Sequence, residues 1–158
     1  MPNITPFLWF DTQAEEAANF YVAIFPNSKV TQIVHRMEAA PDSISDVLTV
    51  AFELDGQKYI ALNGGPQYKF TEAVSLFVNC KTQEEIDHYW SALTADGGQE
   101  VACGWLKDKY GLFWQIAPEG VLDLLASGDR AKANRVMAAV MNMTKLDLAQ
   151  VERASAQG

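Results

Sequence analysis

Two distant segments of the chain begin with the same short pattern of side chains. Thr12-Gln13 is followed by Glu15-Glu16, and Thr82-Gln83 is followed by Glu84-Glu85, with an aromatic pair further along in each segment. A threonine with a glutamate three residues later is the capping-box signature of a helix start. Each expected helix lies between apolar stretches that alternate like strands. The sequence therefore predicts two copies of one β-α-β-β-β unit.

Each half is expected to contain four strands and one helix. In the first half, Asp55-Gly56 separates two alternating segments and is the strongest short signal for a hairpin. Pro26 ends the apolar stripe of the first helix, and a polar loop is expected at Pro41 and Asp42. The expected strands of this half span residues 4–10, 29–36, 47–54 and 57–63.

The same order starts again after the break at residues 63–66. A strand at residues 73–80 is expected to precede a helix that begins at Thr82 and ends at Asp96-Gly97-Gly98. The half closes with a hairpin over residues 103–118, whose turn contains a glycine suited to positive φ.

The exit strand of this hairpin decides most of the functional interpretation. Its side chains alternate, so the sequence predicts one face with Phe113, Gln115 and Ala117 and another with Leu112, Trp114 and Ile116. Gln115 is therefore the one polar side chain in an otherwise apolar stretch.

We expect a single α+β domain over residues 1–158, built of paired βαβββ modules that enclose a cleft between their sheets. The first module is expected at residues 1–65, the second at 71–118, and a helical extension at 119–158. The helices of the extension are too short to be stable alone, so they must dock on another surface. The core of their own chain and a second subunit are both open to them.

Composition argues against several classes of function. The chain has 158 residues, of which 49% are hydrophobic, and a formal net charge of -8. This charge argues against binding of nucleic acid or an anionic membrane, since both require clustered lysine and arginine. The N-terminal residues lack a signal-peptide pattern, and no apolar stretch is long enough to cross a bilayer. With only Cys80 and Cys103, no disulfide scaffold is expected, and a cytoplasmic location is the default.

Three strings of the sequence carry a resemblance to a known family: LNGGPQYKFTEAVS, TQEEIDHYW and CGWLKDKYGLFWQIAPEG. They resemble the PhnB-like family, often labelled 3-demethylubiquinone-9 3-methyltransferase, of the vicinal oxygen chelate (glyoxalase/bleomycin resistance) superfamily. The resemblance extends over nearly the whole chain, from ITPFLWFD to KLDLAQVERA. It implies the glyoxalase/bleomycin resistance/dioxygenase fold of paired βαβββ modules and, frequently, a homodimer.

The resemblance also implies a divalent ion held by histidine and glutamate ligands on four strands. Three of the corresponding segments contain no histidine, aspartate, glutamate or cysteine, namely residues 3–9, 57–63 and 73–79. In the fourth, the turn from Asp108 to Gly111 resembles the turn before the ligand glutamate and aligns Gln115 with the ligand position. Because a neutral amide is a weak ligand, we expect no metal and no other cofactor. His35 and His88 are expected on the surface.

The residues do not support the methyltransferase label. A typical S-adenosylmethionine-dependent methyltransferase has a Rossmann-like parallel sheet, in which a glycine-rich turn after the first strand opens a helix. The glycine pair at a strand end of this chain, in Asn63-Gly64-Gly65-Pro66, opens no expected helix. We therefore interpret this segment as a linker.

Candidate ligand-binding residues are those expected on the cleft faces of the strands and in the adjoining loops. They are Phe7, Trp9, Asn63, Phe77, Asn79, Cys103, Trp105, Phe113 and Gln115. Gln115 could orient a small ligand in an apolar pocket, or it could satisfy neighbouring backbone or water. For the tryptophans, a place in the core is the commoner role in a domain of this size. Cys103 is interpreted as a free, partly buried thiol, because no histidine lies near it in the sequence.

Two functions from different classes follow from these observations. The first is a metal-free small-molecule-binding protein that holds a partly apolar ligand in the cleft. The alternative is an enzyme, either a metal-dependent lyase or dioxygenase or the methyltransferase of the family label. We favour the first, because the sequence contains no set of metal ligands and no acid–base pair with helpful spacing. No catalytic residue is assigned.

Overall fold

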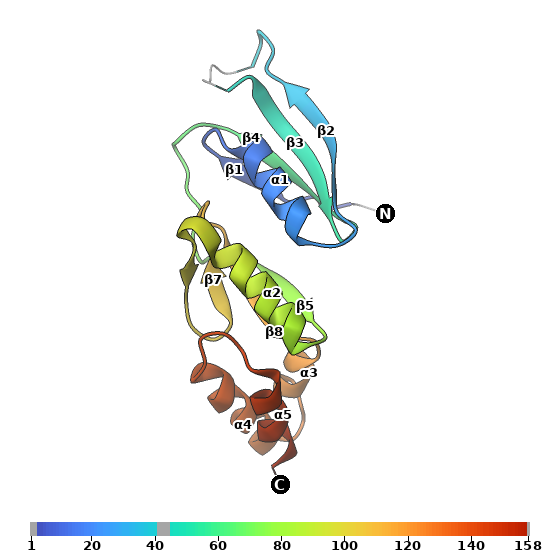
Figure 1. The fold of residues 1–158 in the computed structure, drawn as a ribbon, viewed down its shortest axis with the longest axis vertical. Coiled ribbons are helices and arrows are strands. Elements are labelled where there is room, and N and C mark those ends of the chain that lie inside the picture. Colours follow the sequence, from blue (N-terminus) through green and yellow to red (C-terminus); the bar gives the residue numbers. More distant parts are fainter. Residues whose placement is uncertain (1–2, 41–44, 158) are drawn as a thin grey trace. The chain divides into compact units, whose positions relative to one another are not determined.

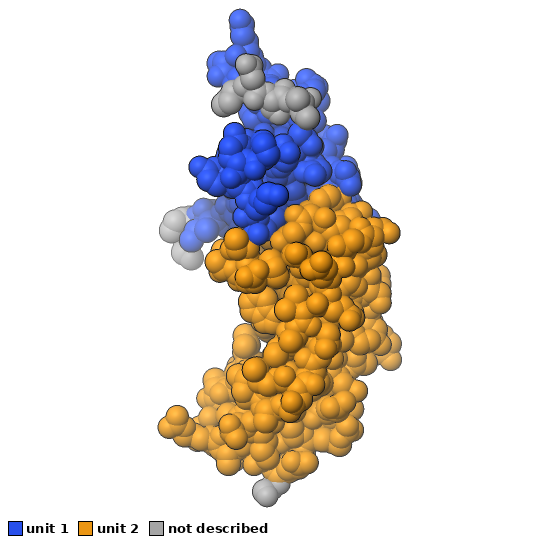
Figure 2. All heavy atoms as spheres, turned by 90° about the vertical axis from the view of Figure 1, so that its left-hand side faces the viewer, with its two compact units in different colours: residues 1–70 blue, residues 71–158 orange. Residues whose placement is uncertain are grey.

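Two compact units make up the structure. The computed structural model describes residues 3–40 and 45–157, and the chain divides into units of residues 1–70 and 71–158 (Figure 2). The loop expected at Pro41 and Asp42 lies outside the described residues. Each unit holds one four-stranded mixed sheet, so the predicted α+β class with paired βαβββ architecture is confirmed.

The first unit combines one sheet with one helix (Figure 1). Its elements are β1 (Phe7–Phe10), α1 (Ala14–Ile24), β2 (Lys29–His35), β3 (Val47–Leu54) and β4 (Gln57–Asn63). The strand order is β1-β4-β3-β2, with β1 parallel to β4 and the other neighbours antiparallel. β3 and β4 match the predicted strands residue for residue. β1 begins later than predicted, after Pro6, which has no N–H to donate to a ladder.

Two turn residues set the β3–β4 hairpin. Asp55 (φ 47°) and Gly56 (φ 83°) both have positive φ, as a two-residue type I′ turn requires. Alternation along β3 then places Val50 and Phe52 in the core. Tyr21 of α1 packs on Phe52, with ring centroids 6.2 Å apart. The turn therefore aligns the strand with the apolar stripe of the helix.

The second unit repeats this arrangement and adds helices after it. Its elements are β5 (Ser75–Cys80), α2 (Gln83–Thr94), η1 (Ala95–Gly97), β6 (Gln99–Glu100), β7 (Trp105–Lys107), β8 (Phe113–Pro118), α3 (Val121–Leu125), α4 (Arg130–Met141) and α5 (Leu148–Ala156). The strand order is β5-β8-β7-β6, with β5 parallel to β8 and the other pairs antiparallel. None of the helices in the described ranges is long and apolar enough to pass through a membrane.

The first helix of each unit begins by different means, although the sequences match. Thr82 caps α2 as predicted, since its Oγ1 accepts a hydrogen bond from N of Glu85 at 3.2 Å. α1 has no such side-chain cap, so the predicted capping box at Thr12 is wrong. Instead, Oδ1 of Asn63, at the end of β4, accepts a hydrogen bond from N of Ala14 at 2.8 Å. A tertiary contact replaces the local cap in the first unit.

The C-terminal helices dock on the second unit through an apolar cluster. Its buried members are Ala117, Val121, Val136, Val140, Leu146, Val151 and Ala154. Phe77 of β5 and Cys103 pack against this cluster. In Figure 1, α3 follows directly on β8, and α4 and α5 (red) lie beyond that end of the sheet. Of the two docking surfaces left open by the sequence, the structure shows the core of the same chain.

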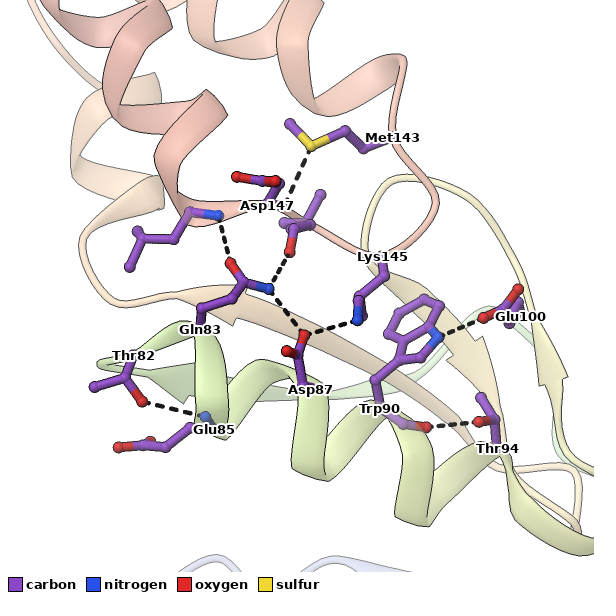
Figure 3. A network of polar contacts seen from close by, with 12 residues as sticks. Thr82, Gln83, Glu85, Asp87, Trp90, Thr94, Glu100, Met143, Lys145 and Asp147 are labelled. Carbon is purple, nitrogen blue, oxygen red and sulfur yellow. Dashed lines mark hydrogen bonds and ion pairs between the residues drawn. The ribbon is translucent and has the colours of Figure 1, made fainter.

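A polar contact joins the start of α2 to the segment before α5 (Figure 3). Nε2 of Gln83 donates to O of Leu146 at 3.2 Å, and its Oε1 accepts from N of Leu148 at 2.8 Å. The same Nε2 donates to Oδ1 of Asp87 at 3.0 Å, and Nζ of Lys145 lies 2.7 Å from that oxygen. Hydrogen bonds from Lys145 and then from Gln83 lower the pKa of Asp87. The contact therefore stabilises the fold above the ordinary carboxyl pKa, and this contribution is lost as the pH falls through the lowered value.

Replacing Gln83 by alanine should loosen the docking of α5. The change removes two hydrogen bonds to the backbone before and at the start of this helix, each contributing about 1 kcal/mol. Amide hydrogen exchange of residues 144–157 should become about 30-fold faster. Gln13→Ala is the matched control, because among the described residues the side chain of Gln13 bonds only to N of Thr12, at 3.3 Å. Equal exchange in the two variants would contradict this role of Gln83.

Candidate functional site

The two faces of the second sheet differ. α2 covers one face, where Leu106, Trp114 and Ile116 are buried (Figure 1). The opposite face, which we call the open face, carries the alternate residues of β5, β7 and β8. Its members are Ser75, Phe77, Asn79, Trp105, Lys107, Phe113, Gln115 and Ala117. This register confirms the predicted alternation of the exit strand.

Gln115 lies at the centre of the open face. Its register partners are Trp105 on β7 and Phe77 on β5, so an aromatic residue stands on each side of the amide. Nε2 of Gln115 donates a hydrogen bond to Oγ of Ser75 at 3.0 Å. Oε1 of Gln115 remains an acceptor, and the hydroxyl of Ser75 keeps its proton for donation. The pair therefore presents both an acceptor and a donor between two aromatic residues.

A buried carboxylate holds the turn that leads into β8. Asp108 is 1% exposed, and its Oδ1 accepts hydrogen bonds from N of Tyr110 at 2.9 Å and N of Leu112 at 3.1 Å. Its Oδ2 accepts from Nε1 of Trp114 at 2.8 Å. This last bond keeps Trp114 on the α2 face and therefore Gln115 on the open face. Asp108 was not among the candidates; the available signal was its Asp-x-x-Gly spacing, since aspartate often bonds backbone N–H groups of its own turn.

The C-terminal helices close one end of the open face. Ala117 belongs to their apolar cluster, and Phe77 packs against it. The other candidates on this face differ in exposure: Trp105 is half-buried, Asn79 is exposed, and Phe113 is buried. The structure thus brings six of the nine candidates to the second unit, five of them on this one face.

The sixth candidate of this unit is Cys103, which lies just before β7. N of Cys103 donates to O of Met143 at 2.8 Å, and its Sγ lies 3.6 Å from Sδ of Met141. It is a half-buried free thiol that contacts the helical extension. Cys80 is buried, and burial, followed by the charge of Glu85, raises its pKa to about 12. Cys80 therefore stays protonated near neutral pH.

In the first unit, Phe7 and Trp9 lie on the sheet face opposite α1, as the repeat predicts. Phe7 is 60% exposed. The ring of Trp9 is held by the segment after β4: its Nε1 donates to O of Gly65 at 2.9 Å, and Tyr68 packs edge-to-face at 4.9 Å. A Cβ on Gly64 would lie 2.4 Å from this ring. The glycine pair after β4 therefore serves the packing of a tryptophan.

Asn63 faces α1, so its expected position on a cleft face is wrong. The side chain is 2% exposed, and its Oδ1 accepts from N of Ala14. Its Nδ2 donates to Oγ of Ser45 at 2.9 Å. The reason is strand parity: Leu62 pairs with Trp9 on the side opposite α1, so the next residue of β4 points toward the helix. The side-chain amide of Asn63 therefore stabilises the start of α1.

The donor groups near Gln115 do not fit a divalent metal ion. Amide and hydroxyl oxygens are neutral and weak donors, and metal sites require several ligands, usually including carboxylate or imidazole. In the part of the chain that the structure describes, no three histidine, cysteine, aspartate or glutamate side chains could together hold a metal. His35 lies 3.1 Å from Asp46 on an exposed surface, and His88 contacts a tyrosine ring of α2.

Paired βαβββ units with helix-covered and open sheet faces define the fold of the vicinal oxygen chelate (glyoxalase/bleomycin resistance) superfamily. The chain belongs to the 3-demethylubiquinone-9 3-methyltransferase family, whose sequence model matches residues 2–117. The match ends earlier than the resemblance of the sequence strings, so the C-terminal helices lie beyond it. No curated protein gave a match to this sequence.

Solved structures agree with this family and fold. A PhnB protein from Bacillus cereus with the same methyltransferase description is 35% identical, covers 74% of this chain and 99% of its own, and has a TM-score of 0.67. The protein PA1353 from Pseudomonas aeruginosa is 18% identical, with coverages of 75% and 98% and a TM-score of 0.64. The fosfomycin resistance protein FosX from Listeria monocytogenes, solved with Mn(II) and sulfate, is 13% identical, with coverages of 75% and 90% and a TM-score of 0.52. The last two show a shared fold alone.

Asp108→Ala should destabilise the second unit by at least about 4 kcal/mol. The change removes the acceptor for two backbone N–H groups and one indole N–H, and charge-assisted hydrogen bonds contribute about 1.5–3 kcal/mol each. Glu72→Ala, which removes an exposed carboxylate from the same unit, is the control and should change stability by less than about 0.5 kcal/mol. Chemical denaturation followed by tryptophan fluorescence measures both. Similar midpoints for the two variants would contradict the role of Asp108.

Proposed function

We propose that this protein binds a small, partly apolar molecule on the open face of its second sheet, without a metal ion. The observation that carries the proposal is the 3.0 Å hydrogen bond from Gln115 to Ser75, with Trp105 and Phe77 in register on either side of Gln115. Small-molecule sites are mostly apolar and aromatic, with a few polar groups that orient the ligand. The open face has this composition.

The chemistry of these side chains supports binding rather than catalysis. An amide and a hydroxyl can orient a ligand, but neither exchanges a proton near neutral pH without an activating partner. Among the described residues of β5, β7 and β8, the open face carries neither carboxylate nor histidine. The carboxylate of Glu100 on β6 belongs to the other face of the sheet, because its Oε1 accepts a hydrogen bond from Nε1 of Trp90 on α2 at 2.7 Å.

The alternative is an enzyme, which the family description and the Mn(II) in FosX both suggest. The two kinds of enzyme make separate demands on the chain. A methyltransferase binds S-adenosylmethionine, whereas a metal-dependent lyase or dioxygenase retains a divalent ion. Each demand can be measured directly on the purified protein.

Native mass spectrometry of the protein purified from its own host tests the proposal. We expect part of the wild-type protein to carry one small organic molecule per chain. Gln115→Ala should reduce binding of this molecule about tenfold, since it removes the orienting amide and leaves Ser75 without its partner. Glu84→Ala is the control and should leave binding unchanged, because Glu84 is exposed on α2, which covers the opposite face of the sheet. One divalent ion per subunit, or bound S-adenosylmethionine, would contradict the proposal and support an enzyme.

We also propose that the chain forms a homodimer. This is supported by large apolar side chains that are exposed in the two units: Ile4, Phe7, Leu122, Met137 and Met141. Met137 and Met141 lie one turn apart on the same side of α4, and contiguous exposed apolar surface often marks an interaction site. Light scattering during size-exclusion chromatography should give a mass twice that of one chain. A monomer mass at micromolar concentration would contradict the dimer.

A further inference from the structure

Polar and aromatic residues alternate over the open face in two adjoining rows. In one row, Phe113 lies in register between Lys107 and Ser75; in the next, Gln115 is flanked by aromatic residues. Lys107 and Ser75 are therefore the diagonal neighbours of Gln115, at Cα separations of roughly 7–8 Å, which long side chains can span. Trp105 and Lys107 share this face because they lie two residues apart on β7.

The hydrogen bond already present decides what this surface can still bind. Nε2 of Gln115 uses one N–H on Oγ of Ser75, so the hydroxyl of Ser75 donates outward. Lys107 adds three N–H donors, whereas Oε1 of Gln115 is the acceptor of the group. Together, Lys107, Ser75 and Gln115 offer more hydrogen-bond donors than acceptors. They therefore favour a ligand that mainly accepts hydrogen bonds.

The charge of Lys107 also favours a ligand that accepts hydrogen bonds. Lys107 is half-buried, and it forms no ion pair with any residue that the structure describes. Lys145, by contrast, lies 2.7 Å from a carboxylate oxygen of Asp87. An ammonium group that has no ion-pair partner can form a charge-assisted hydrogen bond with an adjacent anion. Lys107 on this aromatic surface therefore favours an anionic group on the ligand.

We propose that the open face binds a planar aromatic carboxylate, which deepens the function proposed above and rests on it. The carboxylate accepts hydrogen bonds from Lys107 and from the hydroxyl of Ser75. A polar N–H or O–H of the ligand donates to Oε1 of Gln115. The aromatic ring lies against Trp105, whose flat face provides contact area at little cost in conformational entropy.

Matched probes that share one ring test this proposal. Indole-3-acetate is anionic, indole-3-acetamide is neutral with nearly the same shape, and tryptamine is cationic. Titration of each into the full chain is followed by NMR at the indole N–H of Trp105. We expect indole-3-acetate to bind about tenfold more tightly than the acetamide, and tryptamine to bind most weakly. The preference for the anion should decrease with increasing salt.

Variants at Lys107 assign the preference to one side chain. Lys107→Met should bring indole-3-acetate and the acetamide to equal affinity, whereas Lys107→Arg should keep most of the preference. Lys81→Met removes the same charge from an exposed position of the same unit and should leave the preference unchanged. The arginine variant shows whether any loss in the methionine variant arises from charge rather than from folding.

The possible outcomes separate this inference from the function on which it rests. Equal binding of the anion and the amide to the wild-type chain would overturn the carboxylate class and leave a small-molecule site standing. A preference that survives in Lys107→Met would overturn the assignment to Lys107. If none of the probes shifts the signal of Trp105 at millimolar concentration, the inference and the proposed binding face both fail.

Discussion

The hydrogen bond from Nε1 of Trp114 to the carboxylate of Asp108 is the contact on which the functional interpretation depends. Side chains of a strand alternate with period two, so a slip of β8 by one residue would exchange the places of Trp114 and Gln115. An indole would then occupy the open face, and an amide would be buried beneath α2 without its bond to Ser75. Because Asp108 also accepts from two N–H groups of its turn, one side chain fixes both the turn and the register.

The two units show how one sequence pattern acquires different tertiary roles. The side chain of Gln13 accepts a hydrogen bond from the backbone N of its neighbour Thr12. The equivalent Gln83 instead forms hydrogen bonds with the backbone on either side of Asp147, and these hold the C-terminal helices on the second unit. Those helices pack against Phe77 and so close one end of the open face. They lie beyond the residues that the family's sequence model matches, so this closed end is built by residues outside the matched modules.

Much of the fold was predictable because local signals and tertiary packing agree. Asp55-Gly56 determined the hairpin to the residue, and period-2 alternation placed Gln115 on the correct face of β8. The failures arose where a distant contact overrides a local one. Thr12 does not cap its helix because Asn63 bonds the first N–H of α1, and this contact also removes Asn63 from the cleft-facing set. The burial of Asp108 could not be predicted from the polar segment 107–109 in which it lies. The N–H groups that bond its carboxylate come together only when the turn has formed.

The central claim is that the amide of Gln115 stands on the open face between two aromatic residues. Nuclear Overhauser contacts of its side-chain N–H protons in the full chain test this most directly. The account predicts cross-peaks to ring protons of Trp105 and Phe77 and none to Ile86 or Leu93, which are buried on α2. Cross-peaks to Ile86 or Leu93, with none to the two aromatic rings, would show that β8 is turned over and would contradict the account.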